Sequence, residues 1–120
     1  MLWRTHAVAG ASLSALAFHG DPEKMLWAAA IGGMAALVPD VDSPYSKLGA
    51  KVAPVSAAVS MLAGHRGFTH SLAGSAICCA VLAFALRFWL PAGAVYGFAV
   101  PCVFLGYLSH LLLDALNPQG

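Results

Sequence analysis

The stretch His65-Arg66-Gly67-Phe68-Thr69-His70-Ser71 places two histidines and an arginine together in a chain of which only 9% of residues are charged. Thr69 is a suitable N-cap for the apolar helix expected to follow, which predicts that His70 lies in its first turn. The positive end of a helix disfavours the imidazolium form, so a histidine there tends to stay neutral, as a metal ligand must be. By itself, the stretch is equally compatible with a polar boundary at which a membrane helix begins.

The composition around this stretch is that of a membrane protein. Hydrophobic residues make up 60% of the 120 residues, with only six Lys and Arg and five Asp and Glu. A single domain of this size cannot bury so much apolar surface, because small folds leave a large share of their surface exposed. We therefore expect one membrane-embedded domain over residues 1–120. A net charge of +1 without a basic cluster argues against nucleic acid as a partner.

The apolar runs predict an all-α integral membrane bundle of about four short helices, at roughly 5–19, 22–38, 68–89 and 92–116. Pro22 suits the first turn of the second helix, and Pro101 is expected to kink the fourth. The run at 52–64 is broken by Pro54 and is predicted to be a re-entrant or surface helix. The first run also resembles a secretory signal peptide, and this alternative stays open.

Candidate metal ligands gather on one side if each of the four helices crosses the membrane once. These residues are His6, Asp40, Asp42, His65, His70, His110 and Asp114. His110 and Asp114 are four residues apart and so share a helical face. The same side carries Arg4, Lys47, Lys51 and Arg66, against Lys24 and Arg87 on the other. By the positive-inside rule the cluster is expected to face the cytoplasm.

Four segments together resemble a known family. Thr5-His6, Pro39-Asp40-Val41-Asp42, His65 to Ser71 and Ser109-His110-Leu111-Leu112-Leu113-Asp114 follow the order of the YdjM-type family of inner-membrane, metal-dependent hydrolases. The resemblance implies a small multi-pass helical protein of the bacterial inner membrane, with metal ligands drawn from several helix ends. It also implies chemistry distantly like that of zinc-dependent phospholipase C. Family members usually continue beyond Asn117-Pro118-Gln119-Gly120, so the resemblance implies a fragment or a short form.

The ligand inventory favours a catalytic metal site. Four histidines and three aspartates exceed what one tetrahedral zinc ion needs, and mixed nitrogen and oxygen ligands suit one or two ions of Zn or Mn. Asp42 or Asp114 is a candidate general base, and Arg66 is placed to meet negative charge on a phosphoryl or acyl oxygen. The expected function is hydrolysis of a phosphoester or other ester bond at the membrane surface. A membrane lipid or a lipid-linked phosphate is the expected substrate class.

Two other classes of function remain open from the sequence. A metal or proton transporter would carry polar residues along its helices, whereas the helix middles here are bare. A non-catalytic scaffold would use a structural metal to tie the helices together. Structural sites are closed, while catalytic ones keep a position for water, and this difference leaves no mark on the sequence.

Overall fold

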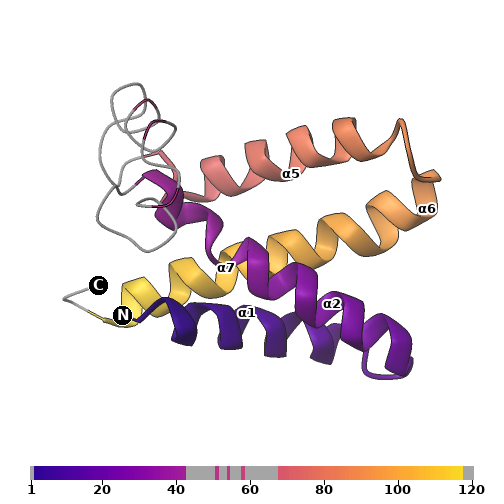
Figure 1. Cartoon of the computed structure of the whole chain (residues 1–120), viewed down its shortest axis with the longest axis horizontal. Coiled ribbons are helices and arrows are strands. Elements are labelled where there is room, and N and C mark those ends of the chain that lie inside the picture. Colours follow the sequence, from indigo (N-terminus) through magenta and orange to yellow (C-terminus); the bar gives the residue numbers. More distant parts are fainter. Residues whose placement is uncertain (1, 43–50, 52–53, 55–57, 59–67, 118–120) are drawn as a thin grey trace.

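The computed structural model describes residues 2–42, 51, 54, 58 and 68–117, and within these residues it is entirely helical. The elements are α1 (Trp3–Ala17), α2 (Pro22–Ala35), the 3-10 helix η1 (Val38–Asp42), α5 (Leu72–Leu86), α6 (Ala92–Ala94), the π-helical turn η2 (Val95–Ala99) and α7 (Val100–Leu116). Figure 1 shows α1 and α2 as an antiparallel pair against α7, with α5 running back alongside α7. The all-α prediction is confirmed.

The turn between α1 and α2 lies at the end of the molecule opposite both chain termini (Figure 1). Asp21 caps α2, because its carboxylate accepts hydrogen bonds from the backbone N–H groups of Glu23 and Lys24. Pro22 occupies the first turn of α2, as predicted, where its missing N–H is not needed. The Asp21 cap and Pro22 fix the start of α2 directly after the turn, and α2 then runs back toward the start of α1.

Small residues let α1, α2 and α7 approach closely. A Cβ atom added to Gly10 would lie 2.5 Å from the carbonyl oxygen of Gly32, and one added to Gly106 would lie 2.2 Å from the same oxygen. Ser14 adds a hydrogen bond of 3.2 Å from its hydroxyl to the carbonyl oxygen of Cys102. Close backbone approach through glycine is typical of helix packing in membranes. It brings the middle of α1 and the middle of α7 against α2 near its end.

The helix predicted at 92–116 forms a continuous helical run over Ala92–Leu116. The kink expected at Pro101 stays a prediction; just before Pro101 lies the π turn η2, in which the N–H of Val100 donates to the carbonyl of Val95. This run is the one described helix long and apolar enough to cross a membrane by itself. The apolar helix α5 has 15 residues, fewer than predicted, so four separate crossings remain a prediction.

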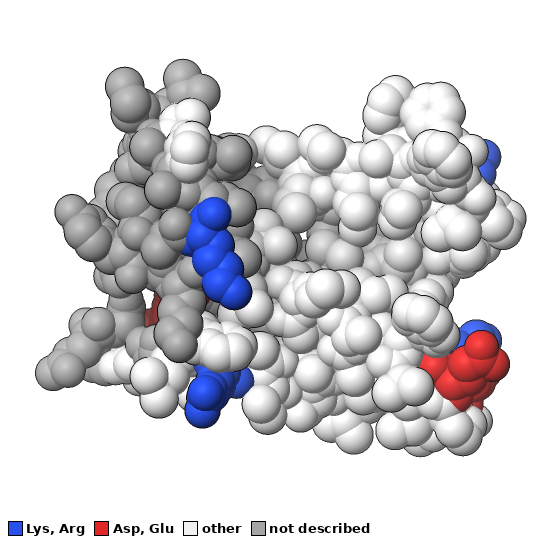
Figure 2. Space-filling model, viewed as in Figure 1, with Lys and Arg blue, Asp and Glu red and all other residues white. Residues whose placement is uncertain are grey.

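On the face drawn in Figure 2, charged side chains lie toward the two ends and the described surface between them is uncharged. Large exposed side chains include Trp27, Phe84, Phe88 and Trp89, the last of them 85% exposed. A continuous apolar surface of this kind suits a lipid environment, and aromatic residues are enriched where such a surface meets water. The re-entrant or surface helix predicted at 52–64 lies mostly outside the described residues.

Candidate metal centre

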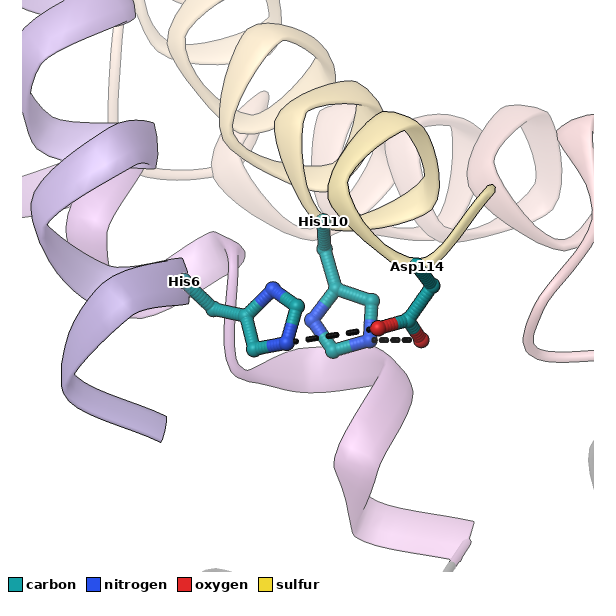
Figure 3. Close-up of side chains that lie close together, drawn as sticks. All are labelled: His6, His110 and Asp114. Carbon is teal, nitrogen blue, oxygen red and sulfur yellow. Dashed lines mark ion pairs between the residues drawn. The ribbon is translucent and has the colours of Figure 1, made fainter. Parts of the chain in front are cut away.

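Five of the seven predicted metal ligands converge at one end of the bundle. His6 lies in the first turn of α1 and Asp40 in η1, His70 stands two residues before α5, and His110 and Asp114 lie on α7. Figure 3 shows His6 reaching across from α1 toward His110 and Asp114. These five residues therefore lie at a common end, as predicted from the order and direction of the helices.

The carboxylate of Asp114 is the centre of this cluster. Its Oδ2 atom lies 3.2 Å from His110 Nε2 and 3.5 Å from His70 Nε2, and its Oδ1 atom lies 3.4 Å from His6 Nε2. Asp40 Oδ1 lies 3.7 Å from His110 Nε2. The predicted pairing of His110 with Asp114 across one helical turn is confirmed.

These separations are those expected of atoms that share a metal ion. Ligand atoms bound to one tetrahedral zinc ion at about 2.0–2.1 Å lie roughly 3.3–3.4 Å from one another. Two groups of three residues have their ligand atoms within 4.8 Å of each other, and His110 belongs to both. The first group adds His6 and Asp114, and the second adds Asp40 and His70. The donor set therefore fits one ion or two.

The orientation of His110 shows which of its nitrogens is available for an ion. Its Nδ1 atom lies 2.6 Å from the carbonyl oxygen of Ala36, and because a carbonyl can only accept, Nδ1 carries the proton. In the neutral ring, Nε2 then presents a lone pair toward Asp40 and Asp114. Nε2 is buried and has no hydrogen-bond partner among the described residues. A lone pair facing two carboxylates is unfavourable unless a positive charge lies between them, and a metal ion or a proton could provide that charge.

The end of α2 makes the Ala36 carbonyl available. After Ala36 the chain tightens into η1, where the N–H of Asp40 donates to the carbonyl of Leu37. Pro39 has no N–H and cannot continue α2. The Ala36 carbonyl is one of the terminal acceptors that an α-helix leaves without an internal donor. A histidine that binds metal usually donates its other N–H to such a group, which fixes its tautomer.

His70 is held differently from the sequence prediction. The N-cap of α5 is Ser71, whose hydroxyl accepts from the N–H of Gly74, so Thr69 is not the cap and His70 precedes the helix. The Thr69 hydroxyl lies 3.3 Å from Nδ1 of His70 instead, and the hydroxyl of Tyr107 donates to the carbonyl oxygen of Thr69. This bond ties the chain beside His70 to α7, one turn before His110.

The two sides of the cluster differ in burial. The side chains of His6 and His110 are 3% and 0% exposed, and their rings stack with centroids 4.0 Å apart. Two imidazolium rings at this distance would repel, which favours a shared ion over two protons. The carboxylates of Asp40 and Asp114 are 24% and 20% exposed, so the cluster is accessible from the carboxylate side.

Three predicted site residues cannot be placed at the cluster. The backbone of Asp42 ends η1, but its side chain lies outside the described part of the structure, as do His65 and Arg66. Sequence reasoning missed the Ala36 carbonyl and Tyr107. The spacing of Tyr107 three residues before His110 would have indicated a shared face. A backbone carbonyl carries no sequence signal.

The YdjM inner membrane protein family matches residues 1–120 of this chain. The inner membrane protein YdjM of Escherichia coli (strain K12) is 41% identical over 88 residues, which cover 70% of this chain and 41% of that protein. The uncharacterized protein YvsG of Bacillus subtilis (strain 168) is 34% identical over 121 residues, which cover 100% of this chain and 70% of the YvsG chain.

A further relative, the inner membrane protein YbcI of E. coli (strain K12), is 34% identical over 99 residues, which are 82% of this chain and 50% of that protein. The chain thus spans about two fifths of YdjM and half of YbcI. No solved structure gives a significant match.

Proposed function

This chain belongs to the YdjM inner membrane protein family, and from that premise we propose that it is a metal-dependent hydrolase of the bacterial inner membrane. It binds one or two divalent ions, Zn in preference to Mn, and cleaves a phosphoester or other ester bond at the cytoplasmic membrane surface. The observation that carries the proposal is the buried Nε2 atom of His110, which faces two carboxylates without a hydrogen bond from any described residue.

Different residues of the described cluster would have different roles in such a site. His6, His110 and Asp114 form one set of ligands and Asp40, His70 and His110 form a second. Asp114, within 3.5 Å of all three rings, neutralises the charge of the bound ion or ions. A bound zinc ion would supply Lewis-acid polarisation of the substrate and acidification of water toward neutral pH. The Ala36 carbonyl keeps the His110 ring in the tautomer that binding needs.

The proton acceptor and the anion-binding group belong to the proposal on sequence grounds. Because Asp114 contacts three imidazoles, we assign it to ion binding and assign Asp42 to accepting a proton from water. Arg66, four residues before His70, meets the negative charge that develops on the substrate oxygen.

The position of the cluster supports a lipid substrate. It lies at one end of the bundle, where the exposed Arg4 shares the first turn of α1 with His6; Figure 2 shows Lys and Arg side chains toward both ends of the face it draws. Basic residues near the cytoplasmic face attract anionic lipid head groups. A head-group phosphoester would therefore meet the cluster at the height where the apolar surface ends.

Metal content measured by mass spectrometry on the detergent-purified protein tests the first step. The wild type should hold at least about one ion per chain, and His110→Ala should lose it. His19→Ala is the matched control, because His19 lies at the other end and its exposed ring is hydrogen-bonded to the carbonyl of Leu16. A wild type without bound Zn or Mn after loading would refute the proposal.

Turnover of a phosphodiester panel in micelles with added Zn or Mn tests the second step. Arg66→Ala should keep its metal and lose on the order of a hundredfold or more in rate, the usual effect of one lost transition-state contact. Full metal occupancy without turnover, together with unfolding on chelation, would instead establish a structural metal in a scaffold. A transporter is disfavoured because the charged side chains among the described residues lie at helix ends.

A further inference from the structure

Both oxygens of the Asp114 carboxylate face imidazole rings, and the two oxygens face different rings. Oδ1 lies 3.4 Å from Nε2 of His6. Oδ2 lies 3.2 Å from Nε2 of His110 and 3.5 Å from Nε2 of His70. Each oxygen of an ionised carboxylate has lone pairs of its own. Asp114 can therefore ligate one ion through each oxygen.

The stacking of His6 on His110 bears on whether the two rings share an ion. The lone pair of an imidazole nitrogen lies in the ring plane, so a bound ion lies near that plane. The two planes are inclined by 24° and the ring centroids are 4.0 Å apart. An ion at about 2.0–2.1 Å from both nitrogens would lie out of the plane of at least one ring. The ring spacing instead matches the roughly 3.5–4 Å between the ions of two-metal sites. The stack thus favours one ion for each ring.

The donors gather mainly on the Oδ2 side of Asp114. His110 offers one lone pair, on Nε2, because its Nδ1 donates to the carbonyl oxygen of Ala36. It can therefore complete only one of the two ligand sets to which it belongs. Nε2 of His70 faces the same carboxylate oxygen, and Asp40 groups with these two histidines. Two imidazoles and two carboxylates supply the four donors that a tetrahedral zinc ion takes.

The position at Oδ1 is less well provided for. The described residues supply it with two donors, Oδ1 itself and Nε2 of His6. Nδ1 of His6 is buried and has no hydrogen-bond partner among the described residues, whereas Nδ1 of His110 has the Ala36 carbonyl. Loss of such an orienting partner typically lowers metal affinity about 10–100-fold. An ion at His6 would therefore bind more weakly than an ion at His110.

We propose that Asp114 bridges two zinc ions of unequal affinity. The tighter ion lies at Oδ2 with His70, His110 and Asp40, and the weaker ion lies at Oδ1 with His6. The zinc concentration then sets whether the cluster holds one ion or two, which provides a means of regulating the proposed hydrolase. The bridge rests on the metal binding in the proposed function, but it does not depend on turnover.

Zinc titration of the full chain in detergent, after removal of metal with a chelator, tests the two positions. The wild type should bind about two ions per chain, the second at least about tenfold more weakly than the first. His6→Phe keeps a stacked ring without a nitrogen donor, so it should lose the weaker ion and change the affinity of the tighter one less than about threefold. His6→Ala serves if that variant does not fold. His19→Phe, at the other end of the bundle, should bind both ions.

Loading with Mn(II) tests the bridge itself. Two Mn(II) ions joined by a carboxylate are magnetically coupled, so the electron paramagnetic resonance spectrum of the wild type should differ from that of an isolated ion. His6→Phe should give the isolated-ion spectrum. A wild type that saturates at one ion, and loses it in His6→Phe, would overturn the bridge and leave the metal centre intact. Two uncoupled ions would also overturn it. A wild type that binds no metal would refute the proposed function as well.

Discussion

Nδ1 of His110 and the carbonyl oxygen of Ala36 are joined by a hydrogen bond of 2.6 Å between α7 and the end of α2. This bond turns Nε2 toward the carboxylates of Asp40 and Asp114 and leaves its lone pair for an ion. The backbone of one helix thereby sets the chemical state of a side chain on another. The geometry of the candidate centre depends on how α2 ends as much as on the ligands themselves.

Tyr107→Phe should weaken metal binding without removing a ligand. The tyrosine hydroxyl donates to the carbonyl of Thr69, beside His70, so its loss frees the chain that carries this ligand. We expect zinc affinity to fall about tenfold or more, as is usual when a group that orients a ligand is lost. The unfolding free energy should fall by about 1 kcal/mol. Competition with a chelator of known affinity measures the first effect. Tyr96→Phe, at an exposed position, is the control, and equal affinities in both variants would contradict the prediction.

Gly32→Ala should disrupt both packing and metal binding. The added Cβ would lie 2.0 Å from the hydroxyl of Ser14 and 2.6 Å from the carbonyl oxygen of Gly10, and the backbone oxygen cannot swing away. Overpacking of this kind costs about 1–3 kcal/mol. Thermal unfolding in detergent should show a lower midpoint, with reduced zinc content because α1 carries His6. Gly93→Ala should change neither quantity, since nothing lies within 4 Å of its Cβ position. A Gly32→Ala protein as stable as Gly93→Ala would show that the helices are packed otherwise.

Zinc should stabilise the wild type against thermal unfolding. At a free concentration of a hundred times the dissociation constant, binding to the folded state alone adds about 2.7 kcal/mol. Asp114→Asn should lose most of this gain, because it removes the carboxylate shared by three imidazoles. Asp21→Asn should retain it, since Asn caps a helix about as well as Asp and Asp21 lies at the opposite end. The test is the shift in unfolding midpoint with and without zinc. A full shift in Asp114→Asn would place the ion elsewhere.

Membrane topology can be tested with single cysteines in a background where Cys78, Cys79 and Cys102 are alanine. If the helices cross the bilayer, cysteines at Leu2 and Leu116 should react with an impermeant maleimide from the cytoplasmic side. Cysteines at Gly20 and Phe88 should react from the other side. All four positions are exposed in the structure. Reaction of the Leu2 and Gly20 positions from the same side would show that α1 does not cross.

The sequence predicted most of the cluster because its ligands lie at helix ends. His110 and Asp114 are one turn apart on a single helix, so their contact at 3.2 Å follows from helical geometry alone. His6, Asp40 and His70 required only the order and direction of the helices, and the bundle brings them to the same end. A residue near a helix end stays at that end of the bundle even if the predicted helix boundary is wrong by a few residues. The predicted grouping therefore holds although the helices are shorter than expected.

The N-cap of α5 is Ser71, and the prediction of Thr69 was wrong. Thr69 and Ser71 are both good capping residues, and local preference does not separate them. In the structure Ser71 is the cap, and Tyr107, which lies 38 residues further along the chain, donates to the Thr69 carbonyl. The acceptor for His110 is a backbone carbonyl, present in every residue, so no side chain marks Ala36. The bonds from Tyr107 to Thr69 and from His110 to Ala36 are tertiary contacts that no local pattern encodes.

The separation of His6 and Asp114 along the chain has a consequence for biosynthesis. The first ligand leaves the ribosome when synthesis of the domain has barely begun, and Asp114 follows only after nearly all of α7 has been made. Contacts between such distant segments form late, because the intervening chain must first be brought together. A nascent chain arrested before α7 would therefore lack two of the five described ligands. If the cluster binds a metal ion as proposed, only chains that include α7 would bind it in the cell, and incomplete chains would not.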